Sequence, residues 1–272
     1  MENNPLVIIT GGSSGIGLAL AKTLSTEGYD LCLLARDVEK LKKAQEEVAA
    51  HVPKGDQKVE IISCDATNYD DLSTKLEIWT SQSGVPDLVI NSAGVTYPGY
   101  FQDLDIDIFH WLMDVNYFGT LNVIKILIPK MIERGSGTIV NISSQASFAG
   151  VYGYSGYGAS KYAVRGLTDV LRSEMKPRGI DFHIVFPPDT ETPQLEFEKD
   201  LKPPETKALA GASSVLLPEQ VADEILKAVK KGKYVIIPGF EGKFLYRLIN
   251  LLGNLVYPIV DLLVRQAQKD KG

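Results

Sequence analysis

Short apolar runs alternate with amphipathic segments along most of the chain. The runs are rich in β-branched residues and are bounded by glycine, proline or charged residues, as is typical of buried strands. Apolar positions three or four residues apart predict helices between them. Continuous apolar strands separated by helices indicate a parallel sheet covered on both faces. The expected strands are 6–10, 30–36, 58–65, 87–94, 137–144, 181–187 and 233–238.

With right-handed crossovers, this order predicts an α/β fold, a doubly wound, Rossmann-like parallel sheet in a single domain over residues 1–240. Residues 188–216 break the pattern, because four prolines and Gly211 interrupt a polar run. We expect this segment to be a loop or a lid over a binding site. The expected helices extend to about residue 27 and then over 37–50, 70–82, 105–133, 157–176 and 218–230.

Residues 243–265 form a last apolar stretch, which is long enough for a membrane span. Its polar residues recur three, four or seven positions apart, so they share one stripe of a helix. Arg247 and Asp261 argue against a span, because charged side chains are costly in hydrocarbon. We therefore expect an amphipathic helical extension over 241–272. Peripheral membrane contact is preferred to the alternative, a helix buried in a subunit interface of a homo-oligomer or over the protein's own pocket. Pro258 is expected to kink or divide this helix.

Composition narrows the functional classes. The 272 residues are 44% hydrophobic, which suffices for one large α/β domain, and the net charge of −6 argues against a nucleic-acid partner. Cys32 and Cys64 lie in apolar runs without the spacing of a metal site, so we expect reduced core thiols and no metal. No basic and then apolar leader precedes the first strand, which favours a cytoplasmic location.

The turn after the first strand has the sequence T-G-G-S-S-G-I-G. Its glycines allow the backbone to approach a phosphate at the start of a helix, where free N–H groups favour anions. Because the turn lies where a dinucleotide site needs it, we prefer this interpretation to a mere tight glycine turn. The expected cofactor-binding residues in the turn are Gly11, Ser13, Ser14, Gly15 and Gly17.

The ends of the next strands favour one cofactor. A carboxylate after the second strand would bind an unmodified ribose, but Arg36 instead offers a fork to a 2′-phosphate, and Lys40 adds charge. The two serines of the glycine turn can donate to the same phosphate. We therefore expect NADPH, the alternative being that both cations only begin a solvated helix. Asp65 can accept from the adenine or cap a turn, and Asn91 can order the sheet or line the cofactor.

The stretch Y-S-G-Y-G-A-S-K-Y-A at 154–163 contains a pair with chemical meaning. Tyr157 and Lys161 are four residues apart, so they share one face of a helix. A free phenol has a pKa near about 10, and a neighbouring ammonium is expected to lower it towards the range useful for proton transfer. The alternative is an aromatic patch on an ordinary helix.

These motifs together resemble the short-chain dehydrogenase/reductase family over about residues 5–240. The matching stretches are T-G-G-S-S-G-I-G, N-S-A-G, V-N-Y-F-G, V-N-I-S-S and Y-G-A-S-K. The interval of thirteen residues before Tyr157 suits the family and selects Ser144 over Ser143. The catalytic tetrad that the resemblance implies is Asn116, Ser144, Tyr157 and Lys161.

The resemblance also implies a role for each of these residues. Tyr157 gives a proton to a ketone oxygen, and Ser144 holds that oxygen in place. Lys161 binds the nicotinamide ribose, and Asn116 anchors a water that relays protons to Lys161.

The stretch F-P-P-D-T-E-T-P at 186–193 departs from the Pro-Gly that most of the family has after the sixth strand. With S-S-Q-A and A-R-D-x-x-K-L, it resembles the branch of the family that reduces 3-ketosphinganine. This implies NADPH-dependent reduction of a long-chain lipid ketone in sphingolipid biosynthesis, on the cytosolic face of a membrane, the endoplasmic reticulum in a eukaryote. The Pro-Pro pair has an alternative role as a rigid entry into the lid, without meaning for the substrate. For the function, the alternatives are reduction of another apolar ketone (steroid, retinoid or 3-oxoacyl) or a noncatalytic NADP-binding sensor.

Overall fold

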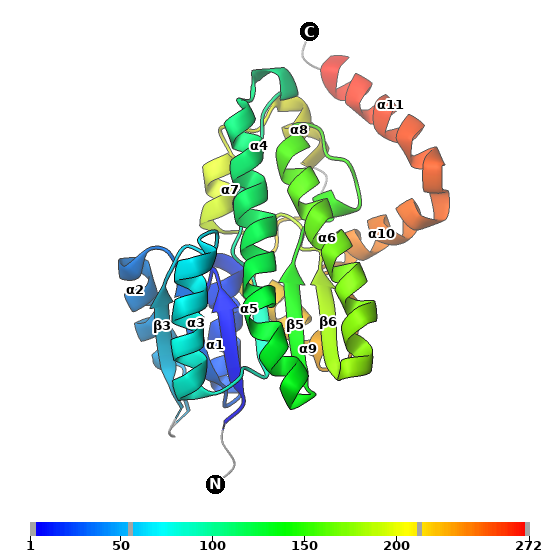
Figure 1. The fold of residues 1–272 in the computed structure, drawn as a ribbon. Helices are drawn as coiled ribbons and strands as arrows, with labels where there is room; N and C mark the ends of the chain where they lie inside the picture. Colours follow the sequence, from blue (N-terminus) through cyan, green and yellow to red (C-terminus); the bar gives the residue numbers. More distant parts are fainter. Residues whose placement is uncertain (1–3, 54–56, 211–213, 270–272) are drawn as a thin grey trace.

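A seven-stranded sheet forms the centre of the computed structural model, which describes residues 4–53, 57–210 and 214–269 (Figure 1). The strand order is β3-β2-β1-β4-β5-β6-β7, and every neighbouring pair is parallel. The expected α/β, Rossmann-like fold is therefore confirmed. The strands are β1 (Leu6–Thr10), β2 (Asp30–Ala35), β3 (Val59–Ser63), β4 (Leu88–Asn91), β5 (Gly137–Ile142), β6 (Ile180–Val185) and β7 (Val235–Ile236).

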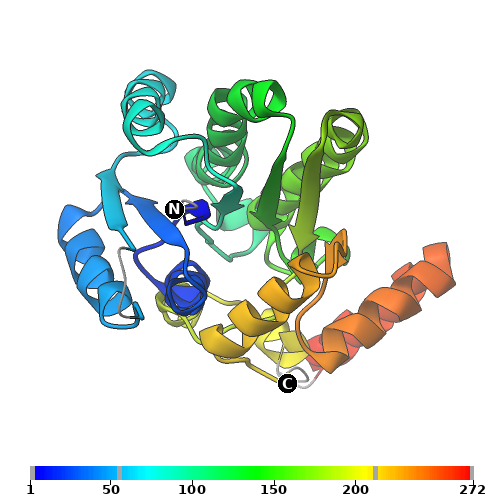
Figure 2. The same cartoon turned by 90° about the horizontal axis from the view of Figure 1, so that it is seen from below.

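Helices cover both faces of the sheet (Figure 2). Strand β1 shows why its sequence is apolar throughout, since Val7 and Ile9 pack against one helix layer, whereas Leu6 and Ile8 pack against the other. Each such side chain stabilises the fold by about 1.5–3 kcal/mol when it is fully buried. The first layer contains α1 (Gly15–Thr26), α2 (Val38–Ala49) and α9 (Pro218–Val229), and the second contains α3 (Tyr69–Ser83), α5 (Gly119–Arg134) and α6 (Ser155–Met175).

The strand order reverses between β1 and β4, which are neighbours in the sheet but not in the sequence. Thr10 and Asn91 pair at the carboxyl ends of these two strands. In open parallel sheets, ligands bind in the crevice at such a switch point. The same end of the sheet carries α4 (Ile106–Met113) and a π-helical turn at Asp114–Phe118 that leads into α5.

The segment 188–216, expected to be a loop or a lid, contains two short helices. They are α7 (Pro193–Glu198) and α8 (Pro204–Ala210), and each begins at a proline. Proline suits the first turn of a helix because its missing N–H would have no partner there. The segment returns on itself, since Thr190 pairs with Leu216 as a parallel bridge. Gly211 lies outside the described residues.

The C-terminal extension consists of α10 (Phe240–Leu252) and α11 (Val256–Lys269), which project from the body (Figure 1). The expected division at Pro258 is wrong. The helix divides at Gly253, whose φ is +53°, while Pro258 lies in the first turn of α11, where it is tolerated. Tyr246 anchors α10 by stacking among Phe148 and Phe186, and α11 passes next to α8.

Candidate active site

The glycine turn leaves no room for larger residues. A Cβ on Gly11 would lie 2.8 Å from the backbone of the loop after β4, and one on Gly17 would lie 2.4 Å from the carbonyl oxygen of Gly11. Gly15 has a φ of +54° and faces Thr192 of the lid segment. Ser14 is the N-cap of α1, yet its side chain makes no hydrogen bond to the described helix backbone. The turn is therefore a close-approach backbone cradle at a helix N-terminus, which fits the phosphates of a dinucleotide.

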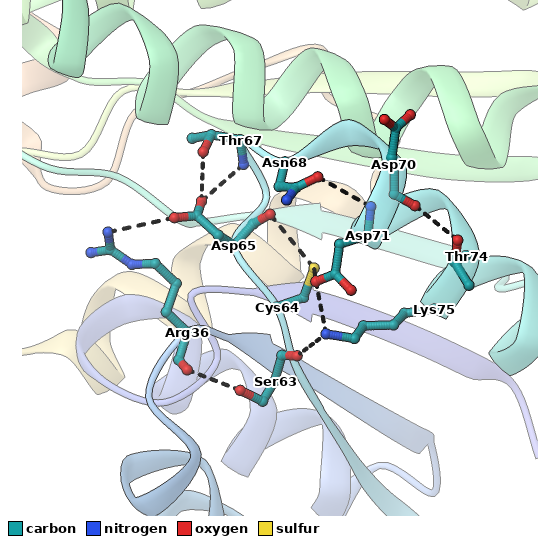
Figure 3. A network of polar contacts seen from close by, with 10 residues as sticks. All are labelled: Arg36, Ser63, Cys64, Asp65, Thr67, Asn68, Asp70, Asp71, Thr74 and Lys75. Carbon is teal, nitrogen blue, oxygen red and sulfur yellow. Dashed lines mark hydrogen bonds and ion pairs between the residues drawn. The ribbon is translucent and has the colours of Figure 1, made fainter.

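Arg36 and Asp65 face each other where β2 and β3 end (Figure 3). Their charged groups are 3.9 Å apart, and the two side chains are 59% and 43% exposed. Asp65 also accepts hydrogen bonds from the backbone N–H and the hydroxyl of Thr67, each at 2.9 Å, so it shapes the local turn (Figure 3). An exposed guanidinium therefore lies at the edge of the sheet where the adenosine end of a dinucleotide is expected.

Lys40 and Asn91 have different environments. Lys40 is 70% exposed in the first turn of α2, at 4.0 Å from Asp37. Asn91 is buried in the sheet, where it donates a 2.8 Å hydrogen bond to Asn141. Its own carbonyl oxygen has no hydrogen-bond partner among the described residues. The structure therefore places Lys40 on the protein surface, four residues after Arg36, and Asn91 inside the sheet, where it orders the central strands.

Tyr157 lies in the first turn of α6, and the side chain of Ser144 is near enough to its hydroxyl to lower its pKa. The Ser144 hydroxyl also accepts from the backbone N–H of Ala146 at 3.1 Å. The hydroxyl of Ser143 instead donates to the backbone carbonyl of Lys161 at 2.9 Å. Successive residues of an extended chain point to opposite sides, so one hydroxyl faces the phenol and the other faces the core.

Lys161 and Asn116 meet beside Gly94. A Cβ on Gly94 would lie 3.1 Å from both the Lys161 Nζ and the Asn116 Oδ1. The Lys161 Nζ is 5.8 Å from the ring centre of Tyr157, and Asn116 is fixed by two hydrogen bonds with the backbone of Val95. Asn116 lies in the π-helical turn, a feature that is frequent at functional sites. The four expected tetrad residues thus come together.

Burial sets the protonation of this site. Loss of hydration raises the pKa of Tyr157 to about 12, although its hydrogen bonds with Ser144 and Gln194 lower it. Loss of hydration also lowers the pKa of Lys161 to about 8. The expected acidification of the phenol by Lys161 is not seen, because desolvation outweighs the neighbours. The phenol therefore keeps its proton at neutral pH, and that is the form that can donate.

The three other tyrosines of this region have other surroundings. Tyr154 donates a 3.0 Å hydrogen bond to Glu198. The ring of Tyr152 meets Tyr100 edge to face at 6.3 Å, and Tyr162 is 44% exposed. The cluster of tyrosines is thus one candidate proton donor surrounded by packing residues.

The lid segment adds polar side chains that the sequence interpretation missed. Gln194 lies near enough to Tyr157 to lower the pKa of its phenol. The carboxylate of Glu198 lies 2.8 Å from the ammonium of Lys202. The Glu198 and Lys202 side chains are only 6% and 8% exposed. Their spacing of four residues was the available signal, but a pair at helical spacing in a proline-rich segment does not reveal that it is buried.

Other reactive side chains have structural surroundings. Cys32 and Cys64 are buried and unpaired, and burial raises the pKa of both thiols. His183 is buried and contacts the backbone carbonyl of Lys233 at 2.7 Å. Within 4–53, 57–210 and 214–269, no group of three or more His, Cys, Asp or Glu residues could hold a metal ion.

Comparisons with known proteins agree with this geometry. The family described as short chain dehydrogenase matches residues 5–201. The chain is 37% identical to 3-ketodihydrosphingosine reductase of Bos taurus, over 89% of this chain and 73% of that protein. It is 38% identical to 3-dehydrosphinganine reductase of Danio rerio, over 90% and 74%. A solved actinorhodin polyketide ketoreductase with NADPH has a TM-score of 0.78 at 25% identity, over 87% of this chain and 97% of that one.

The buried charge of Lys161 predicts a stability change. Because its pKa is lowered from 10.5 to about 8, burying the ammonium destabilises the fold below pH 8, and this cost fades as the pH approaches 10.5. We expect Lys161→Met to raise the free energy of unfolding by about 3 kcal/mol at pH 7 and by less than about 1 kcal/mol at pH 10. Denaturant unfolding without added cofactor measures both values. An equal gain at both pH values would show that packing, rather than charge burial, is responsible.

Proposed function

The chain belongs to the short-chain dehydrogenase family, and from this premise we propose that it reduces 3-ketodihydrosphingosine (3-ketosphinganine) to sphinganine with NADPH. The observation that carries the proposal is a buried Tyr157 beside Ser144 and Lys161, close to a glycine cradle for a dinucleotide. It occurs in a chain that is 35–38% identical to reductases of this ketone over most of its length.

The protein supplies binding, orientation and a proton. When bound, NADPH supplies the hydride that the ketone carbon accepts. Tyr157 then donates its phenolic proton to the ketone oxygen, while the hydroxyl of Ser144 holds that oxygen in place. Lys161 is charged below about pH 8, so it can donate hydrogen bonds to the ribose of the cofactor. Asn116, held by the backbone of Val95, anchors a water that passes protons to Lys161.

Two features support NADPH as the nicotinamide cofactor. Arg36 is exposed at the end of β2, and its fork can bind a 2′-phosphate with two hydrogen bonds. Lys40 stands exposed in the first turn of the following helix. With an acidic residue at this place, the enzyme would instead suit the free ribose hydroxyl of NADH.

A lipid substrate needs access to the site, and we place its entry at α10 and α11. This pair, taken as Phe240–Gln268, is long and apolar enough for a span by length and composition, and none of its most apolar window is buried. Large apolar side chains are exposed on both helices, whereas charged residues interrupt them, which suits a helix lying in a membrane surface. The exposed apolar residues are Phe240, Phe244, Leu245, Leu248, Leu251, Leu255, Tyr257, Ile259, Leu262 and Leu263.

A basic groove next to α10 favours an anionic membrane. It lies between α9, β7 and α10, and one acidic residue, Glu224, pairs with Lys243 at 2.7 Å. Clustered cations beside an apolar helix are attracted by the surface potential of anionic lipids. The cationic residues of the groove are Lys227, Lys231, Lys233, Lys243 and Arg247.

The proton donor is tested by Tyr157→Phe with 3-ketodihydrosphingosine and NADPH. We expect turnover to fall by at least about 100-fold, because general acid catalysis contributes at least that much, while NADPH binding measured by fluorescence is retained. Tyr162→Phe on the same helix is the control, and it should keep its turnover because Tyr162 is exposed. Unchanged turnover in Tyr157→Phe would refute the role of Tyr157 as the acid. If the wild-type protein reduces a steroid ketone but not 3-ketodihydrosphingosine, the proposed substrate is refuted.

Arg36→Asp tests the choice of cofactor. We expect the KM for NADPH to rise on the order of 100-fold, since a charge-assisted pair is lost and a repulsion is added, with little change for NADH. Lys42→Asp is the control, because Lys42 lies on α2, the helix that follows Arg36, and pairs with Glu39 at 2.9 Å. Equal losses for both cofactors would contradict the contact with the 2′-phosphate.

The membrane contact is tested by replacing Leu251 and Leu255 with glutamate. These side chains are 83% and 67% exposed, and we expect binding to vesicles of anionic phospholipid to fall at least about 10-fold, because their apolar burial is lost. Ile78→Glu is the control, since Ile78 is 53% exposed on α3. If vesicle binding stays unchanged while an oligomer dissociates in sedimentation, the two helices form a subunit interface instead.

A further inference from the structure

A buried ion cluster lies in the lid segment and has no part in the proton transfer described above. The Lys202 ammonium is 2.8 Å from the carboxylate of Glu198 and 3.1 Å from that of Asp189. The Lys202 and Glu198 side chains are 8% and 6% exposed, and Asp189 is 39% exposed. Two carboxylates and one ammonium leave a formal charge of −1 in this largely dry region.

This cluster is connected to the candidate proton donor by direct contacts. Tyr154 donates a hydrogen bond to Glu198 at 3.0 Å, and its ring centre is 5.5 Å from that of Tyr157. Gln194, one helical turn before Glu198 in α7, lies near enough to the Tyr157 hydroxyl to lower its pKa. One face of α7 therefore covers the phenol, with an amide at the hydroxyl and a carboxylate next to it.

One of the two carboxylate oxygens of Glu198 has no hydrogen-bond donor among the described residues. Its contacts with Tyr154 and Lys202 both use Oε1, and Oε2 accepts no hydrogen bond within the described part of the chain. The residue as a whole is only 5% exposed. Oε2 is not among the fully buried unpartnered side-chain atoms of the described residues, so it keeps some access, and an ammonium that reaches it gains a charge-assisted hydrogen bond.

Lys202 indicates the kind of donor that this place accepts. Its ammonium lies between two carboxylates and 6.0 Å from the ring centre of Tyr154. An alkylammonium is thus already bound by charge and by an aromatic face. A second alkylammonium at the free oxygen of Glu198 would bring the formal charge of the cluster to zero.

We propose that Glu198 binds the ammonium group of the amino ketone substrate and so determines specificity for it. This inference rests on the proposed function, since that substrate carries its amine on the carbon next to the carbonyl. A group that binds the amine must therefore lie beside the proton donor, where α7 holds Glu198. A ketone without the amine leaves the charge of the cluster unbalanced, which disfavours steroid and 3-oxoacyl substrates.

The test compares two ketones with wild type, Glu198→Gln and the control Glu196→Gln. The ketones are 3-ketodihydrosphingosine and the same chain without its amino group. We expect Glu198→Gln to lower kcat/KM for the amino ketone about 10- to 100-fold, as for a lost hydrogen bond to a charged group, and to change it less than about twofold for the deaminated ketone. Glu196 is 77% exposed on the same helix and contacts only Lys199 at 3.6 Å in the described structure, so its variant should behave as wild type.

The outcomes separate the two proposals. If the wild-type protein turns over neither ketone, the proposed function is refuted, whatever the variants do. With wild-type turnover of the amino ketone present, an equal loss on both ketones, or no loss on either, would overturn the role of Glu198. Retained activity on the deaminated ketone shows that the variant is folded. Should Glu198→Gln not fold, Glu198→Asp keeps the charge with a shorter reach, and it must show the same selective loss on the amino ketone.

Discussion

The exclusion of water from one turn of α6 is the constraint on which the chemistry of this enzyme depends. The same burial raises the pKa of Tyr157 and lowers that of Lys161. The phenol therefore stays protonated, while the ammonium loses its proton at a lower pH than a free lysine does. A protonated phenol is the form that reduction needs, because the ketone oxygen must receive a proton as its carbon accepts hydride. Burying the ammonium of Lys161 therefore lowers the free energy of unfolding, and the same burial sets the pKa values that the reaction needs.

The fold supplies this dry place from two directions. On the side of the sheet, the loop after β5 presents Ser144 to the phenol. The glycine turn approaches the loop after β4 so closely that side chains are excluded. On the other side, the segment 188–216 brings Gln194 near the same hydroxyl, and its Thr192 packs against Gly15. The segment 188–216 therefore lies against both the glycine turn and the candidate proton donor, and it helps to exclude water from both.

Much of this could be predicted from the sequence, because strands and motifs depend on local patterns. The strands of the sheet follow from β-branched runs, and Tyr157 and Lys161 follow from helical spacing. β4 ends at Asn91 instead of residue 94, because the N-S-A-G loop leaves the sheet to contact the glycine turn. The depth of burial, which reverses the expected pKa shift of Tyr157, depends on how a distant segment packs over α6. For the same reason, the sequence analysis did not single out Glu198 and Lys202, whose burial depends on that packing.

Two regions of opposite polarity, the apolar C-terminal helices and the buried ion cluster, suit a single amphiphilic substrate. A long-chain amino ketone has an apolar tail and a charged head next to its reacting carbon. The exposed apolar side chains of α10 and α11 suit the tail, and α11 passes next to α8, which belongs to the lid. The buried ion cluster of the same lid lies by the proton donor, where the head must be. With a purely apolar ketone, the cluster of two carboxylates and one ammonium would keep an unbalanced negative charge, which is costly in a largely buried place. The polarity of the lid is thus a stronger indication of the substrate than the apolar helices are.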